Sequence, residues 1–327
     1  MKKTTLPLER ERDFGDKIND TFTFVKINFK IFVQSIVLIT GPVALIAGIF
    51  AGLHQVNVLG AAGSASASSD TATNINDFLK ALGQSSAQLM TPTYYIMFIA
   101  TIIANVLLVV VVYSFMQVYR ESTERVSFNQ VLEKVKDHFR VVLRCFLAIV
   151  AIMMGILLII GLAIAALSAA LNAGIAAFLS VFLFLPLIYF AVMFSLCPAI
   201  IVFEYSDVSY ALGRAKYLIT NKWWSTFGII MVMGIINYFL SLVFTLPAGI
   251  IMFLKIFKIG SGVTGDASLV ITTTLSTIGS SLVSALSYVA IGLQYFNLVE
   301  KKEGNSLFKK IENIGQKEDH TNDEETY

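Results

Sequence analysis

Long apolar stretches alternate with shorter polar ones along most of the chain. A membrane-spanning helix needs about 20 mainly apolar residues, and six stretches meet that length. They lie at about 29–53, 94–118, 145–170, 174–203, 225–254 and 268–298. The third and fourth are separated only by residues 171–173, where Asn172 followed by Gly174 suits a tight turn. The pattern therefore predicts an all-α integral membrane protein with six transmembrane helices.

The positions of lysine and arginine predict the orientation, because these residues are enriched in cytoplasmic loops. Of the 24 in the chain, only Lys80, Lys255 and Lys258 lie on one side of the six spans. We therefore expect both termini in the cytoplasm and the chain in the cytoplasmic (inner) membrane. Three parts follow: a cytoplasmic segment with an amphipathic interfacial helix at 1–28, the transmembrane domain at 29–298, and a largely disordered, acidic cytoplasmic tail at 299–327.

Each cytoplasmic segment before an outward span shows the same pattern. An Asp or Ser precedes an aromatic residue, apolar residues recur at helical spacing, and an aromatic residue beside a basic one leads into the span. The copies open at Asp13-Phe14, Ser127-Phe128 and Ser209-Tyr210. Asp and Ser are favourable N-caps, and Ser127 with Gln130 fits a capping box. The chain is thus predicted to contain three repeats of an interfacial helix followed by a membrane hairpin.

These helices are expected to lie in the membrane interface with their apolar faces towards the lipid. Basic and aromatic side chains close to the spans suit the headgroup layer. The candidate headgroup contacts are Lys134, Lys136, Arg140, Arg214, Lys222, Trp223 and Trp224. Contact with a cytosolic protein is the alternative interpretation of the same surface.

The last span carries hydroxyl side chains on one helix face, at Thr273, Thr277, Ser280, Ser284 and Ser287. Small hydroxyl residues let membrane helices approach closely and form hydrogen bonds, so a packing seam is the favoured interpretation. The lining of a polar cavity is the alternative.

Small residues and prolines occur within other spans. Ala44, Gly48 and Gly52 form one predicted packing face, and Gly161, Ala165 and Ala169 form another. Prolines within the spans are expected to kink or interrupt their helices, with Pro186 best placed for a central break.

The sequence shows no catalytic or metal-binding arrangement. Charged residues make up 14% of the chain, against about 25% in soluble domains, and all can be assigned outside the six spans. His54, His138 and His320 are too far apart in the predicted topology to converge. Cys145 and Cys197 lie in apolar runs and are interpreted as small core residues. We therefore expect no enzymatic activity, metal or cofactor, and the net charge of +2 indicates no nucleic-acid partner.

Two segments resemble a known family. Residues 209–224, from Ser209-Tyr210-Ala211-Leu212-Gly213-Arg214-Ala215 to Asn221-Lys222-Trp223-Trp224, resemble a family of six-helix bacterial membrane proteins. That family includes YciC-type proteins and the membrane domain attached to some glycerophosphodiester phosphodiesterases. The start, Glu11-Arg12-Asp13-Phe14-Gly15-Asp16, is similar to the same group. The resemblance implies a six-helix membrane fold but no phosphodiesterase activity, because the catalytic barrel, of roughly 250 residues, is absent.

Together these features predict a non-enzymatic accessory or scaffold protein that acts through lipid or protein contacts. Its expected partners are membrane lipids, with a protein partner or a second copy of the chain as further possibilities. The alternative is a permease for a small neutral or amphiphilic molecule, based on the hydroxyl face of the last span and on the proline-containing spans.

Overall fold

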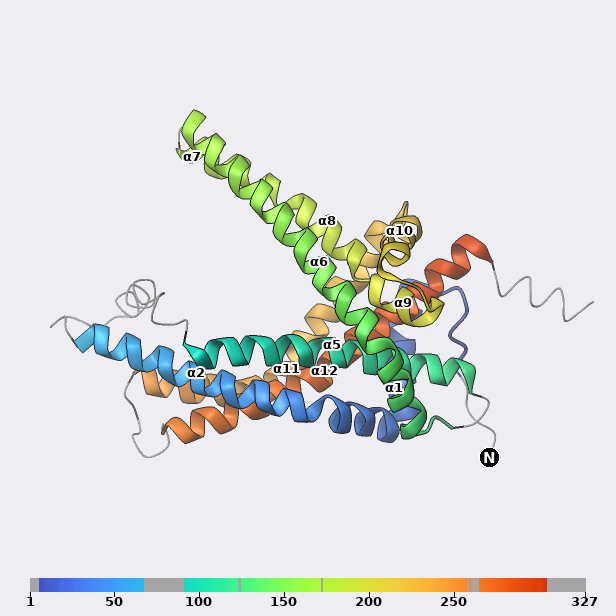
Figure 1. Cartoon of the computed structure of the whole chain (residues 1–327), viewed down its shortest axis with the longest axis horizontal. Helices are drawn as coiled ribbons and strands as arrows, with labels where there is room; N and C mark the ends of the chain where they lie inside the picture. Colours follow the sequence, from blue (N-terminus) through green and yellow to red (C-terminus); the bar gives the residue numbers. More distant parts are fainter. Residues whose placement is uncertain are drawn as a thin grey trace, which may run out of the picture.

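The computed structural model describes residues 6–67, 91–122, 125–171, 173–257, 259 and 265–304. Within these ranges all regular secondary structure is helical. The helices are α1 (Phe14–Ile39), α2 (Gly41–Ala67), α5 (Pro92–Glu121), α6 (Phe128–Ala170), α7 (Ala173–Leu183), α8 (Leu185–Phe194), α9 (Cys197–Glu204), α10 (Val208–Ile219), α11 (Trp223–Ile256) and α12 (Asp266–Glu303) (Figure 1).

Seven helical stretches in this part of the chain are long and apolar enough to cross a membrane. They are α1, Gly41–Gly60 of α2, α5, α6, Phe178–Glu204, α11 and α12. The all-helical, multi-pass membrane character predicted from the sequence is therefore confirmed. The stretches number seven, not six, because the predicted first span covers the end of α1 and the start of α2. The predicted domain boundary after residue 28 also falls inside α1.

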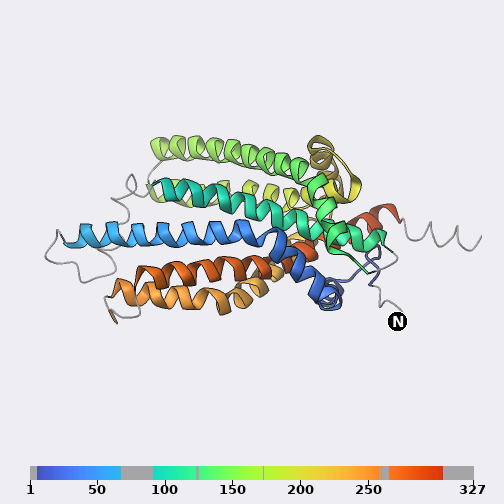
Figure 2. The same ribbon diagram turned by 60° about the horizontal axis from the view of Figure 1, so that its bottom comes forward.

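The junction between α1 and α2 lies at Thr40, two residues before Pro42. Proline has no backbone N–H, so the helix loses a hydrogen bond to Leu38 and bends. The chain is bent along this segment (Figure 2). Prolines also account for the divided fourth span, since Pro186 and Pro198 stand at the starts of α8 and α9. The predicted break at Pro186 is thus confirmed, whereas α11 continues through Pro247.

Both described termini lie at one end of the molecule, called the terminal end below (Figures 1 and 2). Three helices, α5, α9 and α12, finish there and contact one another. Their last turns form the centre of the hydrophobic core, with buried side chains at 110–119, 199–203 and 289–298. Around them, α1 lies against α5 and α12, the start of α6 against α5 and α9, and α10 against α9 and α12.

The three surrounding helices begin in the same way. Their N-caps are Asp13, Ser127 and Asp207. The prediction that the third copy opens at Ser209 is wrong, because the Asp207 carboxylate accepts a hydrogen bond from the Tyr210 N–H at 3.0 Å. Counted from each cap, the side chains four, eight and eleven positions later are buried in all three helices: Lys17, Thr21 and Phe24; Val131, Val135 and His138; Ala211, Ala215 and Leu218.

This register corrects the predicted lipid-facing surface of the second and third copies. Val131, Val135, Ala211, Ala215 and Leu218 belong to the apolar stripe expected to face the membrane, yet each is at most 4% exposed. They pack on the ends of α5, α9 and α12, where apolar surface was available to cover them. In α1, part of the predicted apolar stripe is free to face the lipid, since Phe14 and Phe22 remain exposed.

The predicted interfacial helix is separate from its span only in the third copy. There, residues 220–222 separate α10 from α11, and Asn221 adopts a left-handed conformation with φ of 63°. The second copy continues from Phe128 to Ala170 as one helix of 43 residues. No Pro or Gly interrupts the sequence before the apolar run, so the backbone stays helical.

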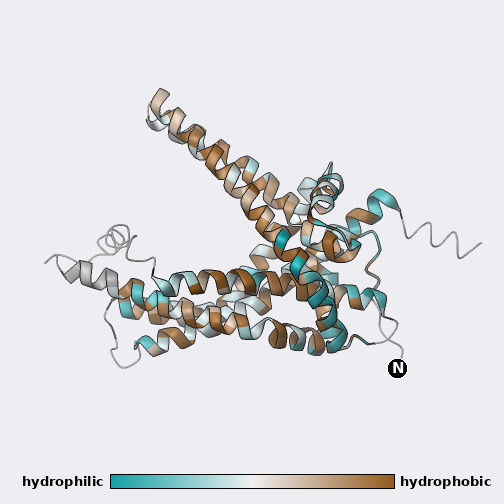
Figure 3. Cartoon of the chain, viewed as in Figure 1, coloured by the Kyte–Doolittle hydropathy of each residue, from teal (hydrophilic) through white to brown (hydrophobic). Residues whose placement is uncertain are grey.

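Helices α6, α7 and α8 form an arm that diverges from α2, α5, α11 and α12 (Figure 1). Beyond the polar first turns of α6, the arm is mostly apolar (Figure 3). Several of its large side chains, among them Leu158, Ile159, Leu162 and Phe178, are about two-thirds exposed within the chain. Such a surface is stable only when lipid or another protein covers it.

The two predicted small-residue faces have different surroundings. Gly48 and Gly52 of α2 lie against α12, where an added Cβ would stand 2.8 Å from Thr274 Cα and 2.6 Å from Val270 Cα. This packing face is confirmed. In α6, by contrast, Gly161 has open space around its Cα, and Ala165 and Ala169 are exposed. That face has no partner helix among the described residues.

Candidate functional site

The terminal end carries an ion pair on each of the three surrounding helices. The charged residue is always the seventh after the N-cap: Asp20 in α1, Lys134 in α6 and Arg214 in α10. Lys134 Nζ lies 3.2 Å from a carboxylate oxygen of Glu121, the last residue of α5. Arg214 Nε lies 3.0 Å from the carboxylate of Glu204, the last residue of α9. These two pairs link α6 and α10 to the end of the helix that precedes each of them.

Tyrosine hydroxyls extend the second and third pairs. The Tyr205 hydroxyl donates to Glu121 at 3.0 Å and accepts from Lys134 Nζ at 2.6 Å. The Tyr295 hydroxyl donates to Glu204 at 2.7 Å. Every charged group is therefore hydrogen-bonded, which is what a partly buried ion pair requires to be stable.

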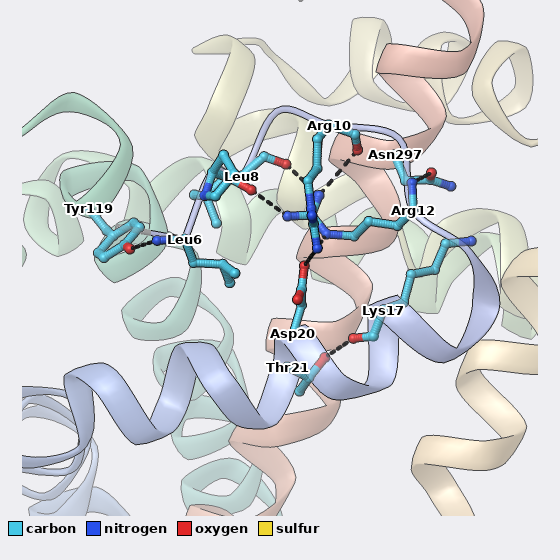
Figure 4. A network of polar contacts seen from close by, with 10 residues as sticks. Leu6, Leu8, Arg10, Arg12, Lys17, Asp20, Thr21, Tyr119 and Asn297 are labelled. Atoms are coloured by element: carbon cyan, nitrogen blue, oxygen red, sulfur yellow. Dashed lines mark hydrogen bonds and ion pairs between the residues drawn. The ribbon is translucent and has the colours of Figure 1, made fainter. Parts of the chain in front are cut away.

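In the first copy the charges are reversed, and the cation comes from the N-terminal segment (Figure 4). The Arg12 side chain is fully buried, and its Nε donates to Asp20 at 2.8 Å. Its other guanidinium nitrogens donate to the carbonyl oxygens of Leu8, Arg10 and Pro7 at 2.6, 3.2 and 2.5 Å. The Arg12 N–H donates to Asn297 of α12 at 2.8 Å. Burial lowers the pKa of Arg12 and the Asp20 hydrogen bond opposes that shift; a guanidinium stays charged.

A pocket of about 240 Å³ lies beside the third pair, among α5, α9, α10 and α12. Its lining is charged and aromatic apart from Val299: Glu9, Arg120, Phe203, Glu204, Arg214, Tyr295, Phe296, Val299, Glu300 and Glu303. A second pocket of about 440 Å³ shares Arg214 and Glu303 with it and is also lined by Tyr210 and Tyr217 of α10.

The two arginines of this pocket are bound to protein groups. Arg214 Nη1 lies 2.5 Å from Glu303, in addition to its bond with Glu204. The hydrogen bond to Glu303 is the main reason that the pKa of Arg214 is raised. Arg120 donates to the Phe203 carbonyl at 3.3 Å, and its guanidinium lies 5.8 Å from the ring centres of Phe203 and Phe296, within the range of cation–π attraction.

The predicted headgroup contacts fall into two groups. Lys136, Arg140, Lys222 and Trp224 are exposed, as a headgroup contact requires. Lys134 and Arg214 are instead bound to carboxylates within the chain.

Trp223 is intermediate between these groups. Its ring is partly buried and stacks on Tyr189 and Phe227, with centroid separations of 6.1 and 5.0 Å.

The hydroxyl face of α12 packs against neighbouring helices. Thr273 donates to Gln55 of α2 at 2.9 Å, and Ser284 accepts from Asn237 of α11 at 3.4 Å. Thr277 and Ser284 also donate to carbonyl oxygens one turn earlier in α12. Ser280 and Ser287 lie on the same half-buried stretch. These contacts fit the packing interpretation, while the two pockets described above lie at the terminal end.

Several members of the ion pairs and pocket were not singled out from the sequence: Glu9, Arg12, Asp20, Arg120, Glu121, Glu204, Glu300 and Glu303. One available signal was that Glu121, Glu204 and Glu300 each stand at the end of a mostly apolar stretch that contains aromatic residues. A carboxylate recurring at that position pointed to a shared role in the three hairpins.

The cysteines behave as predicted for small core residues. Cys145 and Cys197 are fully buried and belong to the hydrophobic core. Over the described ranges, no three His, Cys, Asp or Glu side chains are placed to hold a metal ion.

No family model, curated protein or solved structure matches the chain. The resemblance to YciC-type proteins therefore stays a prediction, and the function has to be argued from the site itself.

Proposed function

We propose that the chain is a non-enzymatic accessory or scaffold protein of the cytoplasmic membrane that works through contacts with anionic lipid headgroups. In this proposal six spans cross the membrane, with α1 and α2 together forming the first. Both termini are cytoplasmic, and the three surrounding helices are the starts of three repeats. The common N-caps, burial register and seventh-position charges support the repeats, and the lysine and arginine distribution supports the orientation.

The observation that carries the proposal is a collar of exposed basic side chains around the terminal end. Each of the three surrounding segments contributes at least two of them. The six considered below are Lys26 and Lys30 from α1, Lys136 and Arg140 from α6, and Lys216 and Lys222 from α10 and the turn after it. Each of the six side chains is exposed, and the ion pairs described above are made by other residues.

A basic collar at this level suits the headgroup layer of anionic lipids. Each lysine or arginine close to such a surface contributes about 1 kcal/mol of attraction. Exposed Trp224, Tyr217 and Phe29 lie in the same segments, and aromatic side chains favour the boundary between headgroups and acyl chains. Charge and aromatic content together favour lipid over a soluble acidic protein as the contact.

The test compares the exposed collar with the internally paired cations. In the triple variant Lys136→Gln, Arg140→Gln, Lys222→Gln, retention of phosphatidylglycerol after gentle detergent extraction should fall several-fold, as counted by native mass spectrometry. The matched control is Lys134→Gln, which changes a basic residue of the same helix that is bound to Glu121. Unchanged retention in the triple variant, or an equal fall in the control, would overturn the proposal.

The permease alternative receives less support from the geometry. It needs a polar path towards the middle of the membrane, and its candidate lining, the hydroxyl face of α12, contacts α2 and α11. The close approach of Gly48 and Gly52 to α12 leaves little room beside that face.

A further inference from the structure

Lys17 of α1 is buried without a counter-charge. The residue is 2% exposed, and none of the ion pairs formed within the described residues includes it. Its ammonium group extends away from the Asp20 carboxylate (Figure 4) and donates to the neutral hydroxyl oxygen of Ser225 at 3.3 Å. An ammonium group has three donors, so this side chain can bind further acceptors. A buried charge is costly unless an anion accompanies it.

The charges around Lys17 add to this deficit of anions. Lys301, Arg12 and Lys222 repel the Lys17 charge, while the Asp13 carboxylate attracts it. Arg12 has its own carboxylate partner, as described above. Lys222 and Lys301 are exposed, and the ion pairs within the described ranges include neither. Three lysines without counter-charges therefore converge from three segments, an arrangement that favours an anion.

The first turn of α11 adds hydrogen-bond donors at the same place. The N-cap of this helix, Lys222, makes no capping hydrogen bond with its side chain. The N–H groups of a first turn have no acceptors within their own helix and carry a partial positive charge. The start of α1 packs against this turn, since a Cβ added to Gly228 would stand 3.2 Å from the Phe14 ring. Lys17 thus reaches Ser225, the third residue of α11.

The Ser225 hydroxyl is placed to act as a further donor. Its oxygen accepts from Lys17 Nζ and, at the longer distance of 3.5 Å, from Gln294 Nε2 of α12. Gln294 is held in place by the Thr226 hydroxyl at 3.0 Å. A hydroxyl oxygen has two lone pairs and one O–H donor. With both lone pairs occupied, the Ser225 O–H is left to donate to an acceptor, and the described residues provide none.

We propose that Lys17, Lys222, Ser225 and Lys301 form a site for a phosphate group, carried by an anionic lipid or by free phosphate. The Lys17 ammonium, the Ser225 hydroxyl and N–H groups of the first turn of α11 donate to the phosphate oxygens. Lys222 and Lys301 attract the phosphate from the surface. This site, called the α11 site below, deepens the proposed function and rests on it for the lipid source, because Lys222 also belongs to the collar.

The first experiment follows thermal unfolding of the delipidated, detergent-solubilised full-length chain while inorganic phosphate replaces chloride at constant ionic strength. The unfolding midpoint should rise, because phosphate binds the folded state. Lys17→Met should need at least about tenfold more phosphate for the same rise, since it loses a charge-assisted hydrogen bond. Ser225→Ala should need about threefold more. The matched control, Lys26→Met, removes an exposed lysine of the same helix and should stay within about twofold of the original chain.

The same measurement separates binding from structural support. Exclusion of phosphate from the protein surface stabilises every variant alike, so the differences between variants report the α11 site. Without phosphate, Lys17→Met should unfold at an equal or higher temperature than the original chain, because an apolar side chain replaces an uncompensated buried charge. A lysine that merely held the fold together would give a lower midpoint in this variant, and that result would contradict the proposal.

The source of the phosphate is decided with lipid. The chain is equilibrated in vesicles of phosphatidylglycerol and phosphatidylcholine, and native mass spectrometry identifies the lipid that dissociates last. A phosphatidylglycerol that is lost in Lys17→Met but kept in Lys26→Met assigns the site to the lipid headgroup. A rise of the midpoint with inorganic phosphate, without this lipid, assigns it to free phosphate. Neither result, or equal losses in both variants, overturns the proposal.

The α11 site and the collar can fail separately. Failure of the collar leaves total phosphatidylglycerol retention unchanged in the triple variant described above. Failure of the α11 site leaves the last lipid and the phosphate response unchanged in Lys17→Met, which alters no collar residue.

Discussion

The Arg214 guanidinium lies 3.0 Å from the Glu204 carboxylate and joins α10 to the end of α9, just as Lys134 joins α6 to Glu121 at the end of α5. Both cations are the seventh residue after an N-cap. The two pairs differ in burial. The Arg214 and Glu204 side chains are 16% and 17% exposed, whereas those of Lys134 and Glu121 are 26% and 39% exposed.

This difference predicts unequal coupling energies. In a double-mutant cycle with Arg214→Met and Glu204→Gln, we expect a coupling of about 1–3 kcal/mol. For Lys134→Met and Glu121→Gln we expect about 0.2–1 kcal/mol, because more exposed charges are better solvated. Reversible thermal unfolding in detergent measures both. Equal couplings would show that burial does not govern these pairs.

The Asp20 carboxylate balances a fully buried guanidinium. Asp20→Asn leaves Arg12 without its counter-charge, and removing one partner of a buried pair costs about 3–5 kcal/mol. The expected result is a lower unfolding midpoint together with faster proteolysis of the N-terminal segment. The control is Asp16→Asn on an exposed face of the same helix, which should change the stability by less than about 0.5 kcal/mol. Similar losses in both variants would contradict the role assigned to Asp20.

The general architecture was predictable because it depends on composition over long windows. Apolar runs of sufficient length identified the membrane helices, and Asp13 and Ser127 marked two helix starts correctly. The third start was misplaced because Asp207 and Ser209 are both good caps, and sequence alone does not show which side chain reaches a backbone N–H.

The pocket was harder to predict, because it unites residues distant in the chain. Glu9, Arg120 and Glu303 meet only after α5, α9 and α12 have packed. The apolar stripes of α6 and α10 were misassigned to lipid for the same reason: periodicity shows that a face is buried but does not identify what covers it.

The two small-residue faces give a direct test of the packing between α2 and α12. Gly52→Leu places a side chain where even a Cβ would stand 2.6 Å from Val270 Cα, so the helices must separate. We expect a destabilisation of at least about 1–3 kcal/mol, the usual cost of overpacking. Gly161→Leu, in the open face of α6, should be tolerated by the monomer. If Gly161→Leu lowers the unfolding midpoint as much as Gly52→Leu does, the α6 face is covered in the assembled protein.

The chain has two tryptophans, and these neighbours have different surroundings. Trp223 stacks on Tyr189 of α8 and on Phe227, and so joins the arm to α11, whereas Trp224 is 77% exposed.

The variants Trp223→Phe and Trp224→Phe each leave a single tryptophan, whose fluorescence reports its own position. In vesicles of brominated lipid, we expect strong quenching of Trp224 and several-fold weaker quenching of Trp223, which protein rings shield. Trp223→Ala should also lower the stability by about 0.5–1.5 kcal/mol for each aromatic pair that it removes. Trp224→Ala loses edge contacts with Trp223 and Phe227, but it should lower the stability less because the side chain is 77% exposed. Equal quenching of the two side chains would mean that Trp223 is not packed against the arm in the membrane.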